Sequence, residues 1–182
     1  LFVSKSVAKG RLPQQAEIAL AAFKAGVCVS ANLSIGQFDS HANNDRDQMR
    51  LIPEFLSAID DLLRRAEDLQ IRDKLVVVIQ SEMGRRPLYN KGNGKDHWSI
   101  GSIMFLGAGI KGNRVIGATD EKQFLVPVDA STLALSTETG IRVRPEHIHT
   151  ALRELAGIED HPASKQFPLD VPDNERLSHL WG

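Results

Sequence analysis

The sequence predicts an α/β fold with a mostly parallel sheet flanked by helices, and three observations predict it. Apolar residues recur every three or four positions over about residues 48–69, which indicates a long amphipathic helix. The continuous apolar run 75–79 follows this helix and is typical of a strand covered on both faces. A second apolar run, 27–33, precedes the helix. This β-α-β order favours parallel pairing through a right-handed crossover.

The other elements follow in order along the chain. Residues 13–26 are expected to form the first helix, because a proline suits its first turn and a glycine suits its end. The short apolar run 103–106 is expected to form a third strand, residues 107–120 are turn-rich, and residues 115–116 and 124–126 are short strand candidates. A last helix is expected over residues 145–156, with a glycine directly after it.

The length and composition fit one globular domain. The chain has 182 residues, of which 42% are hydrophobic and 25% charged, so it can bury a sizeable core. We therefore expect a single α/β domain over residues 1–182. Because the chain begins with Leu1 rather than Met, we expect a trimmed chain, a proteolytic product or a fragment of something longer, and the resemblance given below implies part of a larger domain. The proline-containing tail 159–182 is expected to lie extended over the surface or to contact a partner.

Charge and hydropathy exclude several classes of partner. Basic and acidic residues are balanced at 22 and 23, so no overall field favours nucleic acid or an anionic membrane. The sequence has no apolar stretch long enough for a membrane span, and its first residues lack the apolar centre of a signal segment. The single cysteine, Cys28, lies in an apolar run and is expected to be a small buried hydrophobic residue rather than a nucleophile.

The first polar cluster follows the run 27–33 and contains Asp39 and His41. Side chains two apart in an extended segment point the same way, so this carboxylate and imidazole can share one cation. The alternative is local: Asp39 closes a turn, and Asn43, Asn44 or Asp45 caps the following helix. Capping leaves His41 unexplained, and the two interpretations remain open.

The second cluster follows the run 75–79 and contains Glu82, Arg85 and Arg86. A carboxylate in this position must be exposed, paired with a cation or bound to a metal ion. One alternative is therefore a structural ion pair between Glu82 and Arg85. The other is functional, because a guanidinium beside a metal ion can donate two parallel hydrogen bonds to a phosphate or sulfate group.

The third cluster contains Asp96, His97 and Trp98. His97 can bind a metal ion through one ring nitrogen, while Asp96 binds the same ion, orients the imidazole or serves only as a turn residue. Carboxylate and imidazole ligands together suit zinc or manganese, with calcium or magnesium as alternatives. The four remaining histidines are interpreted as solvated: His147, His149, His161 and His179.

Two other motifs give only weak evidence of a functional site. Residues 107–112 have the spelling G-x-G-x-x-G after a predicted strand, but a β-like segment follows where a dinucleotide site needs a helix. No serine lies in a nucleophile-elbow context, and no Ser-His-Asp arrangement can be recognised from spacing.

Four motifs in one order resemble a bacterial family of exported proteins, catalogued as domain of unknown function family number 1501. They are FDSHANN at 38–44, VVIQSEMGRRP at 77–87, KDHW at 95–98, and GAGIKG at 107–112 followed by VIGATD at 115–120. The resemblance covers about residues 15–158. It implies a periplasmic or extracellular location.

That family resembles a branch of the alkaline phosphatase and sulfatase superfamily, whose α/β sandwich uses one or two metal ions to cleave phosphate or sulfate esters. The resemblance implies that Asp39, His41 and His97 hold one metal ion and that Glu82 is an acidic ligand of the second. Met83 stands where the superfamily often has a histidine, so the second site departs from the pattern. The chain resembles the carboxyl-terminal half of such a protein, and the nucleophile would lie in the amino-terminal half.

The resulting expectation is a metal-dependent hydrolase of phosphate or sulfate esters in which Arg85 or Arg86 stabilises the charge of the transferred group. Its substrate would be a small anionic ester or a sulfated glycan, and its partner a second copy or an amino-terminal half. The alternative is a non-catalytic metal- or anion-binding or assembly module of the same fold. A third interpretation is a structural fragment whose clusters only brace loops.

Overall fold

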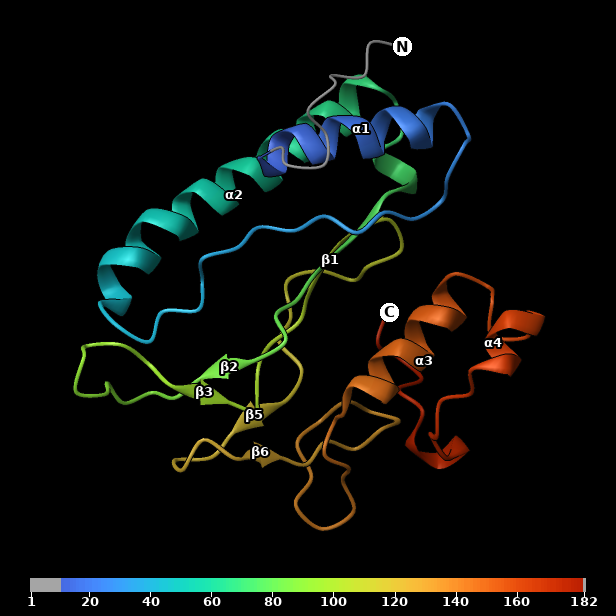
Figure 1. Ribbon diagram of the computed structural model, residues 1–182. Coiled ribbons are helices and arrows are strands. Elements are labelled where there is room, and N and C mark those ends of the chain that lie inside the picture. The colour runs from blue at the N-terminus through green and yellow to red at the C-terminus, as the bar shows by residue number, and fades with distance from the viewer. Residues whose placement is uncertain (1–10, 182) are drawn as a thin grey trace. The chain divides into compact units, whose positions relative to one another are not determined.

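The computed structural model describes residues 11–181, and these residues fall into two compact units, up to Ala108 and from Gly109 onward (Figure 1). Each unit has its own cluster of buried apolar side chains. The single domain expected over residues 1–182 stays a prediction. No helix of the described residues is long and apolar enough to cross a membrane.

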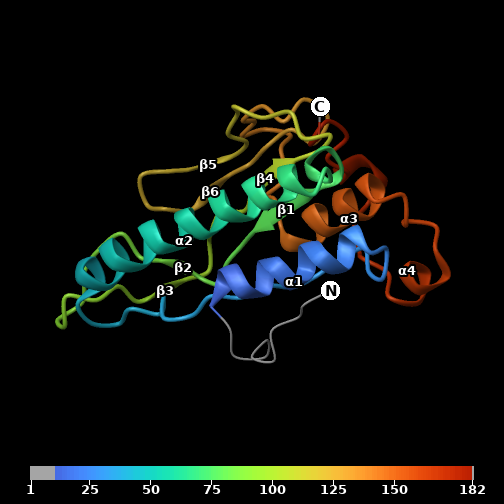
Figure 2. The ribbon, with the colours of Figure 1, turned by 90° about the horizontal axis from the view of Figure 1, so that it is seen from above.

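Two helices dominate the first unit, α1 (Leu12–Lys24) and α2 (Asn44–Asp68), followed by the 3-10 turn η2 (Arg72–Lys74). Both predicted helices are confirmed within a few residues at each end. The views from the side and from above show α1 alongside the second half of α2 (Figure 1, Figure 2). Small residues allow this close packing, because the buried cluster consists of Ala16, Leu20, Leu62 and Ala66.

The strands of the first unit pair antiparallel. β1 (Val76–Ile79) pairs with β4 (Met104–Gly107), and β2 (Gly84–Arg85) pairs with β3 (His97–Trp98) as a hairpin. β1 and β4 lie where strands were expected. The described part of residues 27–33, however, forms no strand, and the pair across α2 that we expected to be parallel is not formed.

The segment after α1 also differs from its prediction in burial. Val27 and Val29 are largely exposed, and Cys28 is half-buried rather than fully buried. An apolar run becomes a buried strand only when neighbouring strands and helices cover it. Of this run, Leu33 packs against the cluster between α1 and α2, whereas Val27 and Val29 stay exposed. The mostly parallel sheet stays a prediction.

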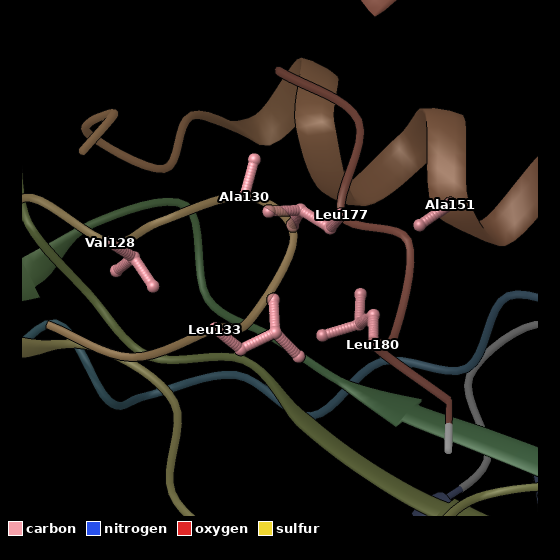
Figure 3. Packing of buried hydrophobic residues seen from close by; sticks show 6 residues of the cluster. All are labelled: Val128, Ala130, Leu133, Ala151, Leu177 and Leu180. Carbon is pink, nitrogen blue, oxygen red and sulfur yellow. The ribbon is translucent and has the colours of Figure 1, made fainter. Parts of the chain in front are cut away.

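The second unit contains the short strands β5 (Ala118–Thr119) and β6 (Leu125–Val126), which pair antiparallel, and the helix α3 (Pro145–Leu155). This helix confirms the prediction for residues 145–156 to within one residue. Figure 3 shows the buried cluster of the unit, to which α3, the loop after β6 and the C-terminal segment all contribute. Its members are Val128, Ala130, Leu133, Ala151, Leu177 and Leu180.

The C-terminal segment differs from the extended tail that we expected. It contains the short helix α4 (Pro162–Gln166) and the turn η3 (Asp173–Glu175), and it places Leu177 and Leu180 in the buried cluster. These two leucines have apolar neighbours to pack against, so burying them stabilises the segment against the unit.

His147 is also not solvated, contrary to the sequence interpretation, because only 1% of its surface is exposed. Its Nδ1 accepts the backbone N–H of Arg144 at 2.9 Å, and its Nε2 lies 3.1 Å from a carboxylate oxygen of Glu175. The helix pattern places His147 off the apolar stripe, but it cannot show that η3 covers that side of α3.

Candidate metal centre

Three side chains from two distant segments meet around one carboxylate oxygen. Asp39 Oδ1 lies 3.0 Å from His41 Nδ1 and 2.9 Å from His97 Nε2. One potential ligand atom from each residue lies within 4.8 Å of the others. The two imidazole rings meet edge to face, with their centroids 4.7 Å apart. The structure therefore brings together the first and third clusters of the sequence.

The hairpin β2–β3 brings Arg85 to the same oxygen. Arg85 lies directly opposite His97 in the strand register. One of its guanidinium nitrogens donates to Asp39 Oδ1, and the other donates to the carbonyl oxygen of Lys95 at 2.8 Å. Because the second bond fixes the guanidinium, Arg85 is a preorganised cation at the edge of the centre.

Backbone pairing between two loops fixes the positions of Asp39 and His41. The loop before α2 and the loop between β2 and β3 are joined by an antiparallel bridge at Ala42 and Asn93. The N–H of Lys95 donates to the carbonyl of Ser40 at 3.0 Å. A Cβ on Gly94 would lie 1.9 Å from the carbonyl carbon of His41, so only glycine permits this close approach.

Asn90 braces the loops of the candidate centre, and the sequence interpretation missed it. Its side-chain N–H groups donate to the carbonyl of His41 at 3.0 Å and to Asp96 Oδ1 at 2.9 Å. Its Oδ1 accepts the N–H groups of Gly92 and Gly94, each at 2.9 Å. The signal was present, because an asparagine two and four residues before glycines favours such a side-chain turn.

The residues at the start of α2 do not form the hydrogen bonds that the capping interpretation predicts. The Ser40 hydroxyl is buried and donates to Asn44 Oδ1 at 2.7 Å. Asp45 accepts from the Tyr89 hydroxyl at 2.7 Å and from the Asn44 amide. The helix has no side-chain cap at Asn43, so Asn44 and Asp45 brace loops rather than cap the helix.

The charges around Asp39 favour its ionised form. The hydrogen bond from Arg85, and after it that from His97, lowers the pKa of Asp39 from 3.8 to about 2. The side chains of Asp39, His41 and His97 are 65%, 48% and 47% exposed, so the centre is open to solvent. An ionised carboxylate beside two imidazoles on an open surface can receive a cation and leave part of that cation accessible.

Three of the predicted site residues lie outside this group. Glu82 is exposed, and Arg85 pairs with Asp39 rather than with Glu82. Asp96 bonds to Asn90 instead of His97. Arg86 places its guanidinium 6.0 Å from the ring centroid of Trp98. Successive side chains in a strand point to opposite faces, which is why Arg85 reaches the centre and Arg86 does not.

Comparisons with known proteins give a family but no described activity. The family model that matches this chain is described as "Protein of unknown function (DUF1501)", and it covers residues 7–157. No curated protein matches the chain, and no solved structure matches it. The family model covers most of the sequence, and the chain belongs to the DUF1501 family.

Proposed function

We propose that this centre holds a divalent metal ion and that the protein hydrolyses phosphate or sulfate esters. The observation that supports the proposal is the meeting of Asp39, His41 and His97 within 4.8 Å, with Arg85 beside them. Zinc and manganese both bind a ligand set of one carboxylate and two imidazoles. With three protein ligands, the ion would keep a coordination position open for substrate. The donor set therefore fits the ion.

The roles follow from the chemistry of each group. Asp39, His41 and His97 would hold the ion, which when bound supplies a Lewis acid for the ester oxygen. Arg85 would bind the anionic group, because its planar guanidinium is anchored by Lys95 and already faces the centre. The nearby Ser40 hydroxyl does not serve as a nucleophile, since it is buried and bonded to Asn44.

A second candidate is a module of the same family that binds a metal ion or an anion without catalysis, because Asp39, His41, His97 and Arg85 supply groups that bind ions. In such a module, Arg85 and the two imidazoles would attract an anion, and no bond would be cleaved. Binding with no turnover distinguishes this candidate from the hydrolase.

The first experiment measures metal content. Wild type, Asp39→Ala and His97→Ala are loaded with zinc or manganese, dialysed identically and analysed by elemental mass spectrometry. We expect about one ion per wild-type chain and a loss of at least tenfold in both variants, since removing even an outer partner of a metal ligand typically costs 10–100-fold. Asp60→Ala is the matched control, because Asp60 is an exposed aspartate that pairs with Arg64 on α2, and it should retain the ion. A wild type that retains no ion contradicts the proposal.

The second experiment measures turnover of 4-nitrophenyl phosphate and 4-nitrophenyl sulfate by the metal-loaded protein. We expect His97→Ala to abolish turnover and Arg85→Ala to lower kcat/KM by about 10²-fold, the usual effect of removing one group that stabilises transition-state charge. Arg86→Ala is the control for a nearby arginine outside the centre. Metal binding without any turnover would favour the non-catalytic module.

A further inference from the structure

Ser40 lies between the two candidate ligands Asp39 and His41, and its side chain points into the protein. Ser40 is only 4% exposed, whereas the side chains of Asp39 and His41 are 65% and 48% exposed. Successive side chains of an extended segment alternate in direction, so one anchored side chain also sets the direction of its two neighbours. The contacts that anchor Ser40 therefore determine which way Asp39 and His41 point.

The Ser40 hydroxyl is anchored by two residues one turn apart on α2. It accepts a hydrogen bond from Gln48 Nε2 at 3.0 Å and donates one to Asn44 Oδ1 at 2.7 Å. Gln48 Nε2 also donates to the carbonyl of Phe38 at 3.0 Å. Asn44 is buried like Ser40. The helix thus holds the chain on both sides of Asp39, through Phe38 before it and Ser40 after it.

The backbone of Ser40 links the same segment to the hairpin β2–β3. Its carbonyl accepts the N–H of Lys95 at 3.0 Å. The carbonyl of Lys95 in turn accepts a hydrogen bond from the Arg85 guanidinium at 2.8 Å. Lys95 also precedes His97 by two residues. Both groups of the hairpin that contact Asp39 are therefore connected to Ser40 through Lys95.

We propose that Ser40 is a positioning residue of the centre, which keeps Asp39 and His41 on the side of the loop that faces the hairpin. An ion then meets ligands that are already ordered, and such outer contacts raise metal affinity. This effect on a metal ion rests on the proposed function. The geometric role does not, because the hydrogen bonds of Ser40 involve only the protein.

The first test measures the geometry of the centre in the metal-free full chain. The rings of His41 and His97 have centroids 4.7 Å apart, so their ring protons should give a nuclear Overhauser effect in wild type. Ser40→Ala removes both hydroxyl hydrogen bonds, and we expect the effect to be lost. Ser40→Thr keeps the hydroxyl and should keep the effect. An unchanged effect in Ser40→Ala overturns the proposal.

Gln48→Met tests the same anchor from the helix, at a half-buried position and with little change in side-chain length. It removes the donor to Ser40 and Phe38, so it should also weaken the effect between the two rings. Gln15→Met is the matched control, because Gln15 lies on α1 and bonds the backbone of Ser34 in the same loop at 2.9 Å. Equal effects in both glutamine variants contradict the proposal, even if Ser40→Ala does not fold.

Cobalt(II) measures what the positioning does for an ion, because it binds nitrogen and oxygen sites as zinc does. Titration followed by visible absorption gives a dissociation constant for each full-length variant. We expect Ser40→Ala to weaken cobalt binding by about tenfold or more, as for other outer partners of metal ligands. Ser40→Thr and Gln15→Met should bind cobalt as wild type does.

The two measurements separate this inference from the proposed function. A wild type that binds no cobalt contradicts the metal centre, while the signal between the rings of His41 and His97 still tests Ser40. Cobalt binding that is equally tight in wild type and Ser40→Ala overturns the positioning role and leaves the metal centre standing.

Discussion

Arg85 determines the charge state of Asp39, and its removal gives the most direct test of the centre. We expect Arg85→Ala to raise the pKa of Asp39 from about 2 to a value that stays below 3.8, because His97 still bonds to the carboxylate. Carbon-detected NMR of the Asp39 carboxyl group in the metal-free chain measures this pKa. Arg86→Ala should leave it unchanged, and a pKa that also stays near 2 in Arg85→Ala would contradict the geometry.

Asp129 gives a pH-dependent contribution to stability in the second unit. Hydrogen bonds from the Ser131 hydroxyl, and then from the Thr132 backbone, lower the pKa of Asp129 from 3.8 to about 2. The folded state thus favours the carboxylate, and this contribution is complete above pH 3.8 and is lost as the pH falls towards 2.

We therefore expect the urea midpoint of Asp129→Ala to lie below that of wild type at pH 6, and the difference between them to shrink as the pH approaches 2. The control is Asp120→Ala, because Asp120 is also an exposed aspartate that accepts hydrogen bonds within a turn. A difference that is constant with pH would show that ionisation of Asp129 does not stabilise the fold.

The sequence predicted the residues of the centre better than it predicted their roles. Asp39, His41 and His97 lie together, as the family resemblance implied, and Arg85 lies beside them. Local patterns place each residue in a loop or strand but do not bring together segments that are 58 residues apart. Whether Glu82 binds a metal ion stays a prediction. For Asn90, sequence spacing favours the turn with Gly92 and Gly94 but does not reveal the bonds of its side chain to His41 and Asp96.

At the scale of elements, the close approach of two loops depends on Gly94. We expect Gly94→Ala to destabilise the chain by about 1–3 kcal/mol and to lower metal retention, because the new Cβ would overlap the backbone at His41 and separate the loops. Thermal unfolding and elemental analysis measure the two effects. Gly112→Ala is the matched control, since nothing lies within 4 Å of its Cβ position.

Helices were predicted well and strand partners were not, for a physical reason. The apolar stripe of α2 is a property of one segment, and its helical period determines the buried face. A strand needs a second segment, so an apolar run cannot specify whether its neighbour is parallel, antiparallel or missing. For this reason β1 was located correctly while its antiparallel pairing with β4 was not foreseen.

At the scale of the whole molecule, His147 joins α3 to a segment 28 residues away along the chain. We expect His147→Ala to lower the free energy of unfolding by about 1–3 kcal/mol, because it empties a fully buried side-chain position and removes two partly buried hydrogen bonds. Hydrogen exchange over residues 173–181 should become faster, while the exposed control His149→Ala should match wild type. Slow exchange in both variants would show that Leu177 and Leu180 hold this segment without the histidine.

The division into two units was not visible in the sequence. Each unit buries its own apolar cluster, yet composition reports only the total of apolar residues and not how contacts divide them. The leucines of the C-terminal segment illustrate this, because nothing local distinguishes a leucine in a tail from one that completes a core.

The contact between Asp39 and His97 joins residues that are 58 positions apart, with the whole of α2 between them. Closing so long a loop delays the contact during folding, whereas α2 and the hairpin β2–β3 can form from local interactions. An interaction that forms after the folding transition state slows unfolding and leaves the folding rate almost unchanged. Any cation held by these residues should therefore lengthen the lifetime of the native state without accelerating its formation.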